Sequence, residues 1–259
     1  MKTIWALAFV VIKELYRRKD FYVLFVLSAL ITIAAGSVNF FNDSSIVRYL
    51  KDICLLLIWL STLIIAVVTT ARQIPAEKEN RTIFPLLAKP VSRAQLVIGK
   101  FLGCWLATGM ALLVFYVFFV IVTGARDQDW QLAAYLKAVG LQWMMLGVVV
   151  AMTLLGSVVF SAVSATATIC VIVVGGILFL GEHLIKIALR QSEPINTILY
   201  ALYFCIPHLE LFDLRQQLVN SQSMPGISDC GLAALYAIAY ISMILVLTWL
   251  RFRRSSLST

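Results

Sequence analysis

The residues best suited to chemistry are two histidines and two glutamates in the segment 182–230. Glu182 and His183 are adjacent, and His208 and Glu210 stand two positions apart. Imidazole nitrogens and carboxylate oxygens both bind zinc in proteins, so these four side chains could hold a metal ion. Their spacing matches no short metal-binding motif, however, and interfacial hydrogen bonding explains them more simply. We therefore predict no metal site and leave open a ligand role for His183 and His208.

A second candidate is the Gly99-Lys100 pair, because Gly-Lys also ends the phosphate-binding loop of many nucleotide hydrolases. That loop reads Gly-x-x-x-x-Gly-Lys followed by Ser or Thr, so that backbone amides cradle the phosphates and the hydroxyl holds magnesium. Here Phe101 follows the lysine, and the upstream glycine is replaced by Ala94. The pair instead indicates the start of an apolar helix. We predict that this chain has no catalytic residues, no cofactor of its own and no enzymatic activity.

The five cysteines show neither Cys-x-x-Cys spacing nor a zinc pattern. Three of them lie in apolar runs, where a thiol usually packs as a small hydrophobic group. The other two share the segment 182–230 and could form a disulfide in an oxidising compartment. The three apolar cysteines are Cys54, Cys104 and Cys170, and the possible pair is Cys205 with Cys230.

Composition places the chain in a membrane. Hydrophobic residues make up 61% of the 259 positions and charged residues only 13%, with a mean hydropathy of +0.94. No water-facing globular surface accommodates that balance. A bilayer core about 30 Å thick requires roughly 20 apolar residues per helical crossing. The net charge of +8 lies at the ends of the apolar runs, which fits lipid headgroups and membrane topology better than nucleic acid.

The apolar runs predict an all-α, polytopic fold with six transmembrane helices in a single transmembrane domain over residues 1–259. The stretch 138–181 contains no charged residue and is too long for one helix, so we divide it at a small-residue turn over 161–166. The predicted crossings are 21–41, 53–71, 101–123, 138–160, 164–181 and 231–250.

Two further segments are expected to lie at the membrane surface. Residues 3–19 hold too few apolar residues to span and end in a basic cluster, so we predict an interfacial helix on the inner side. Residues 182–230 form a mixed segment on the outer side. Within it, the apolar stretch 195–207 is too short to cross and is predicted to be an interfacial or re-entrant helix.

Basic residues predict the orientation. With the N-terminus in the cytoplasm, the inner segments hold 14 of the 21 lysines and arginines. The positive-inside rule therefore favours both termini in the cytoplasm, which agrees with an even number of crossings. No charged residue interrupts any predicted crossing. This argues against a proton-coupled transporter and against an intramembrane hydrolase, because both need a buried ionisable group.

The most informative sequence lies between the second and third crossings, in the cytoplasmic segment 72–98. A charged stretch is followed by the apolar patch 83–88 and then by the break Lys89-Pro90-Val91-Ser92-Arg93. An apolar patch with charged flanks could dock on a soluble partner, with the patch as anchor and the charges as rim. By composition alone, an ordinary basic cytoplasmic loop is the simpler interpretation.

The order of motifs in this segment resembles a known family. Glu-x-Glu, Arg-Thr, then Leu-Leu-Ala-x-Pro-Val-Ser-Arg and finally Gly-Lys are similar to the first cytoplasmic loop of ABC-2 type transporter permeases. This is the exporter class that includes the permease of the nitrous-oxide reductase maturation system. The similarity is strongest over 72–103, and the six-crossing layout extends it loosely over the whole chain.

The resemblance implies a coupling segment that sits in a cleft of a separate cytoplasmic ATPase, which would hold the ATP and Mg. Two permeases, identical or homologous, would pair with two ATPases in the inner membrane, together with lipids and an accessory protein outside the cytoplasm. The export substrate is not implied, and nucleic acid is not an expected partner. The implied ATPase-coupling residues are Glu77, Lys78, Glu79, Asn80, Arg81, Thr82, Ile83, Phe84, Leu86, Leu87 and Arg93. The alternative is a membrane scaffold or assembly factor that docks a soluble protein without transport.

Overall fold

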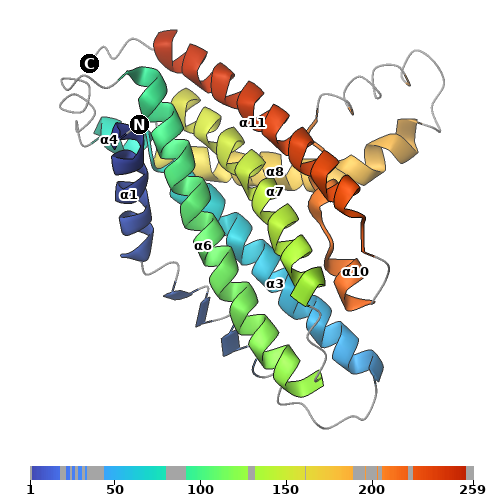
Figure 1. Ribbon diagram of the computed structural model, residues 1–259. Coiled ribbons are helices and arrows are strands. Elements are labelled where there is room, and N and C mark those ends of the chain that lie inside the picture. Colours follow the sequence, from blue (N-terminus) through green and yellow to red (C-terminus); the bar gives the residue numbers. More distant parts are fainter. Residues whose placement is uncertain are drawn as a thin grey trace.

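The computed structural model is mainly helical over the residues it describes, which are 2–17, 22–23, 25–26, 29–30, 33, 44–79, 92–127, 132–160, 162–188, 196, 203, 206–220 and 224–254. No strand occurs in these ranges. Long helices lie side by side in a bundle, and one helix leaves it at a steep angle (Figure 1). The predicted all-α class is confirmed.

The bundle is built from α3 (Ser44–Ala71), α6 (Arg93–Asp127), α7 (Leu132–Val159) and α11 (Ile227–Arg254). α3 packs on α6 and α7, and α11 packs mainly on α7. Within the described part of the chain, four stretches are long and apolar enough to cross a membrane: Lys51–Glu77, Arg93–Thr123, Leu132–Val159 and Ile227–Arg254. The chain is therefore a multi-pass membrane protein. Six crossings and the cytoplasmic termini remain predictions.

Two predicted crossings are not among these four. Most of 21–41 lies outside the described residues. The stretch predicted as 164–181 belongs to α8 (Val163–Ala188), whose apolar described portion, Val163–Leu178, is shorter than the other four. α8 is the helix that diverges from the bundle in Figure 1.

Helix ends differ from the ends of the apolar runs. α3 begins at Ser44 rather than at 53, and α6 begins at Arg93 rather than at 101, so the Gly99-Lys100 pair lies inside α6 and does not open it. α7 ends at Val159 and α8 begins at Val163, so residues 163–166 of the predicted turn 161–166 are helical. Hydropathy indicates where a helix meets lipid, whereas the backbone hydrogen bonds of a helix continue into polar sequence.

Two tryptophans and two glycines join α6 to α7. The indoles of Trp105 and Trp143 stack with centroids 4.7 Å apart, and each Nε1 donates to the other residue's carbonyl oxygen, at 2.9 and 3.2 Å. The indole of Trp143 lies against Gly109, and that of Trp105 lies against Gly147. A Trp-x-x-x-Gly spacing on each helix therefore permits reciprocal close packing.

Buried polar side chains also join three helices. The Tyr116 hydroxyl of α6 donates to Gln142 Oε1 of α7 at 3.0 Å, and Gln142 Nε2 donates to Thr62 Oγ1 of α3 at 3.0 Å. All three residues are buried. Because an unpaired amide is costly away from water, this chain of hydrogen bonds fixes the register of the helices.

Small residues allow α7 to approach α8 closely at Gly156 and α6 closely at Gly147. A Cβ on Gly156 would lie 2.7 Å from Cys170 Sγ, and one on Gly147 would lie 2.9 Å from Trp105 Nε1. Gly175 and Gly176 on α8 differ, because a Cβ there would meet no atom within 4 Å. Close packing therefore accounts for the first two glycines and not for the last two.

The segment before α11 packs on α3, α7 and α8. It contains η1 (Leu209–Phe212), which packs on α7 and α8, and α10 (Arg215–Val219), which packs on α3. Arg215 forms an ion pair with Asp213 at 2.6 Å and lies over the Trp59 ring of α3, 4.5 Å from its centroid. The helix predicted over 195–207 lies almost wholly outside the described residues.

Candidate functional site

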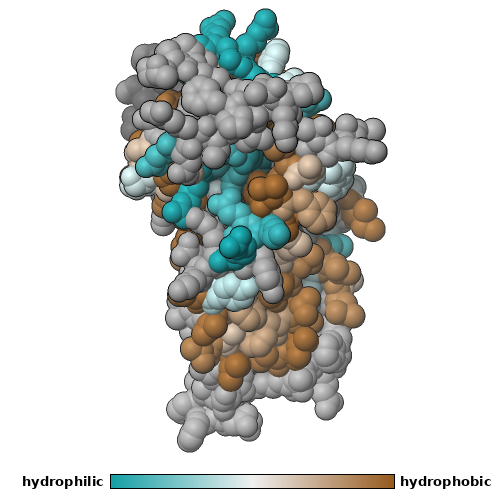
Figure 2. Space-filling view, turned by 90° about the vertical axis from the view of Figure 1, so that its left-hand side faces the viewer, coloured by the Kyte–Doolittle hydropathy of each residue, from teal (hydrophilic) through white to brown (hydrophobic). Residues whose placement is uncertain are grey.

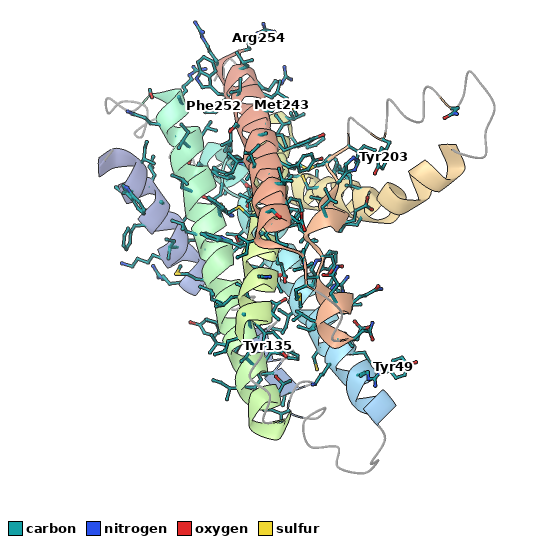
Figure 3. The ribbon with its side chains drawn as sticks, turned by 45° about the vertical axis from the view of Figure 1, so that its right-hand side comes forward. Tyr49, Tyr135, Tyr203, Met243, Phe252 and Arg254 are labelled. Atoms are coloured by element: carbon teal, nitrogen blue, oxygen red, sulfur yellow. The ribbon has the colours of Figure 1, made fainter. Side chains whose placement is uncertain are left out.

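The described part of the predicted coupling segment lies where α3 ends, α6 begins and α11 ends (Figure 1). Figure 1 shows the short helix α4 (Pro75–Glu79) at this end, beside α1 (Lys2–Tyr16). Figure 3 labels Phe252 and Arg254 at the same end of the bundle, and Tyr49 and Tyr135 lie toward the other. Of the predicted ATPase-coupling residues, Glu77, Lys78, Glu79 and Arg93 are described. Asn80, Arg81, Thr82, Ile83, Phe84, Leu86 and Leu87 lie outside the described residues.

A tight turn separates α3 from α4. The amide of Gln73 donates to the Thr70 carbonyl oxygen at 3.1 Å, and the amide of Ala76 donates to the Arg72 carbonyl oxygen at 3.1 Å. Pro75 occupies the first position of α4, where its fixed φ suits a helix and its missing N–H costs nothing. Glu77 then falls in the first helical turn, where the helix dipole favours a carboxylate.

Glu77 faces the interior of the protein. Its carboxylate pairs with Lys100 of α6 at 2.5 Å, and the side chains are only 18% and 6% exposed, respectively. Lys100 Nζ also donates to Gln73 Oε1 at 3.0 Å. A lysine ammonium this deeply buried must be paired to remain charged at acceptable cost. Glu77 and Gln73 therefore allow Lys100 to lie inside the bundle.

The same cluster reaches α1. Gln73 Nε2 lies 3.5 Å from Glu14 Oε2 and also donates to the Thr69 carbonyl oxygen at 3.3 Å. We call Glu14, Gln73, Glu77 and Lys100 the polar network. It connects the N-terminal helix, the turn before α4, α4 itself and α6.

Glycines on α6 bring α1 against this network. A Cβ on Gly99 would lie 2.9 Å from Leu7 Cβ, and one on Gly103 would lie 2.8 Å from Val11 Cβ and 2.9 Å from Ala8 Cα. α1 therefore packs lengthwise on the first part of α6, with Ala8 and Val11 buried. The predicted position of this helix in the inner interface remains a prediction.

Glu79 differs from Glu77, because it is exposed. It lines an open groove of about 820 Å³ together with Arg72 and Pro75 on one side and Ala162, Val163 and Ser164 on the other. The groove therefore runs between α4 and the α7–α8 turn. Figure 2 views the molecule from the α1 side and shows hydrophilic residues toward this end, with a hydrophobic band below them.

Arg93 fastens the end of α11 to the start of α6. Its Nη1 donates to the carbonyl oxygens of Phe252 and Arg253, both at 2.9 Å, and its guanidinium lies 5.6 Å from the Phe252 ring centroid. The last carbonyls of a helix lack intrahelical donors, so a cation there satisfies them and complements the dipole. The contact of Arg93 with an ATPase remains a proposal.

The residues before and after Arg93 begin α6. The Ser92 amide donates to Gln95 Oε1 at 3.1 Å, and the Gln95 amide donates to Ser92 Oγ at 3.2 Å. This reciprocal pair is a capping box. The Ser-Arg part of the Pro-Val-Ser-Arg motif thus has a physical role within the chain, which is to start one helix and to hold the end of another.

The sequence does not reveal that Glu14, Gln73 and Lys100 belong to one cluster. Lys100 was interpreted as a helix start, although it follows seven residues of α6 and lies within a Gly99-x-x-x-Gly103 spacing that signals close packing. That spacing could have indicated a helix packed on this face. The participation of Glu14 and Gln73 is visible only in three dimensions.

The structure also bears on the predictions of metal binding by histidines and of a disulfide between cysteines. Among the described residues, no group of three metal-ligating side chains occurs. The His208 ring lies between aromatic rings, 4.2 Å from the centroid of Tyr203 and 6.3 Å from that of Tyr236. The side chain of His183 is outside the described part. Cys230 is a free thiol, and Cys205 is not described, so the structure does not contain the suggested pairing.

Comparison with known proteins identifies the family. The sequence matches the family model described as ABC-2 family transporter protein over residues 6–257, which is nearly the whole chain. No curated protein matches the sequence significantly. The family match does not bear on the narrower similarity to the permease of the nitrous-oxide reductase maturation system, which stays a prediction. The multi-pass bundle and this match together show that the chain belongs to the ABC-2 transporter family, as a membrane permease component.

Proposed function

We propose that this chain couples ATP hydrolysis by separate cytoplasmic ATPase subunits to the export of a substrate across the inner membrane. The observation that carries the proposal is the structure of α4, a short helix that immediately follows an apolar crossing. One of its carboxylates, Glu79, is exposed, whereas the other, Glu77, is held inside by Lys100. The face with Glu79 would bind a partner. The face with Glu77 would transmit the partner's movement to α6. Family membership supports a transport role.

The proposed cycle uses two permeases and two ATPases. Dimerisation of the ATPases around ATP and Mg would displace α4 and the segment that follows it, including the coupling residues from Asn80 to Leu87. Because α4 is joined to α6 by a buried ion pair, the displacement would tilt the crossings as rigid bodies between accessible states. The permease copies are identical or homologous. No observation favours the scaffold alternative, and the family is one of transporters.

Charge reversal at Glu79 tests the docking surface. We expect Glu79→Arg to weaken retention of the ATPase subunit about tenfold, equivalent to about 1.4 kcal/mol, because a charge at an interface rim would become repulsive. The measurement is affinity purification of the tagged permease from native membranes in mild detergent, with quantification of the co-eluting ATPase. The matched control is Arg48→Glu, which reverses an exposed charge at the other end of α3. Equal retention in both variants would contradict α4 docking, and the absence of any ATPase with the unmodified chain would contradict the proposed function.

A further inference from the structure

The polar network joins parts of the chain that are distant in sequence. Glu14 and Gln73 are separated by 59 positions, and Gln73 and Lys100 by 27. Gln73 is 3% exposed and Lys100 is 5% exposed. Separating the Glu77–Lys100 pair would leave charges without compensation in a site that excludes water, which is much more costly than moving the paired groups together. The network therefore resists shear between α4 and α6.

The contact of α1 with α6 is of a different kind. It is made over Gly99 and Gly103, where Leu7, Ala8 and Val11 of α1 lie against the glycine backbone. Because glycine has no side chain that could form a bond, this contact is held by close packing alone. The hydrogen bond from Gln73 to Glu14, by contrast, is directional and originates in the turn that leads directly into α4. Motion of that turn would therefore act on α1 through Glu14.

We propose that the polar network is a mechanical linkage, through which displacement of α4 by the ATPase is passed to α1. The inference rests on the proposed function and adds α1 to the moving parts. In this linkage Gln73 is the positioning residue, because its amide oxygen accepts from Lys100 while its amide nitrogen donates to Glu14. The ion pair between Glu77 and Lys100 joins the linkage to α6 at its other end.

The exposed face of α1 suits this movement. Trp5 is 55% exposed, Phe9 68% and Val10 61%. These apolar side chains would lie against lipid on the inner side of the membrane. A shift of α1 would therefore change the lipid environment of this face, and a probe on it should report the shift.

An environment-sensitive fluorescent amino acid at position 9 makes the linkage measurable. The permease is purified with its ATPase, placed in lipid nanodiscs, and compared in the nucleotide-free state and after ATP trapping with vanadate. We expect trapping to shift the wavelength of the fluorescence emission in the reference chain, which carries the probe and no other substitution. In Gln73→Leu most of this shift should be lost, because α1 loses its link to the α4 turn. ATPase binding and trapping should persist, since the Glu77–Lys100 pair remains.

Two controls keep the test decisive. Glu14→Ala removes the α1 end of the linkage without touching the buried core, and it should reduce the shift as Gln73→Leu does. Gln216→Leu changes the same residue type at an exposed position on α10 and should leave the shift unchanged. A full-sized shift in both Gln73→Leu and Glu14→Ala would overturn the linkage while leaving the proposed function intact. If no ATPase binds or traps with the reference chain, both proposals fail together.

Discussion

At the scale of single residues, Lys100 and Arg93 show how a charged side chain within a hydrophobic chain acquires a role. Lys100 is enclosed and compensated by Glu77 and Gln73, so its charge joins helices and does not face solvent. Arg93 is only partly buried and bonds to backbone carbonyls that the end of α11 leaves without donors. Both residues appear in the sequence as ordinary members of a basic cytoplasmic segment. The two residues differ in the groups that they contact, which are a carboxylate and an amide for Lys100 and backbone carbonyls for Arg93.

Removing the Arg93 guanidinium should loosen the end of α11. We expect Arg93→Ala to lower the free energy of unfolding by about 1–3 kcal/mol, because hydrogen bonds from a charged donor are lost. Arg93→Lys should recover only part of this, since an ammonium lacks the planar fork. The measurement is unfolding by denaturing detergent, followed by tryptophan fluorescence.

The control for that experiment is Arg254→Ala, which removes an exposed arginine from the same turn of α11 and should change stability by less than about 0.5 kcal/mol. If Arg93→Ala and Arg254→Ala lower the free energy of unfolding equally, the hydrogen bonds from Arg93 to the carbonyl oxygens do not stabilise the protein.

At the scale of helices, close approach is governed by glycines whose spacing is visible in the sequence. Gly99 and Gly103 bring α1 against α6, and the two Trp-x-x-x-Gly pairs bring α6 against α7. Hydropathy predicted that these helices exist, because lipid requires long apolar runs. It placed their ends inaccurately, because α3 and α6 continue through polar residues stabilised by capping and internal hydrogen bonds. The sequence did not predict which helix packs on each helix face, since this packing depends on residues distant in sequence.

A methyl group on Gly103 should disturb the α1–α6 contact. Gly103→Ala places a Cβ 2.8 Å from Val11 Cβ and 2.9 Å from Ala8 Cα, so α1 must move outward at a cost of about 1–3 kcal/mol. Gly140→Ala is the control, because a Cβ at that helical position meets nothing within 4 Å. It should be neutral or stabilise the protein by up to about 1 kcal/mol through helix propensity. Detergent-induced unfolding of the two variants provides the comparison, and equal stabilities would rule out the tight contact.

At the scale of the whole molecule, the family match supports the proposal that this chain works with a separate ATPase. The all-α class and the permease assignment could be predicted from apolar runs and from the motif order in 72–103. The internal role of Glu77 could not, because its sequence neighbours resemble those of Glu79 and only the fold shows that one faces Lys100 and the other the surface. The α4 end of the bundle is where a cytoplasmic ATPase would have to bind.

Accessibility of that end in living cells tests this account most directly. The measurement is labelling by a membrane-impermeant maleimide in a chain whose five native cysteines are replaced, with one new cysteine at either Glu79 or Arg48. The account predicts that Glu79→Cys is protected in intact cells and labelled after permeabilisation, whereas Arg48→Cys is labelled in intact cells. Labelling of Glu79→Cys from outside intact cells would contradict a cytoplasmic coupling helix and the function built on it.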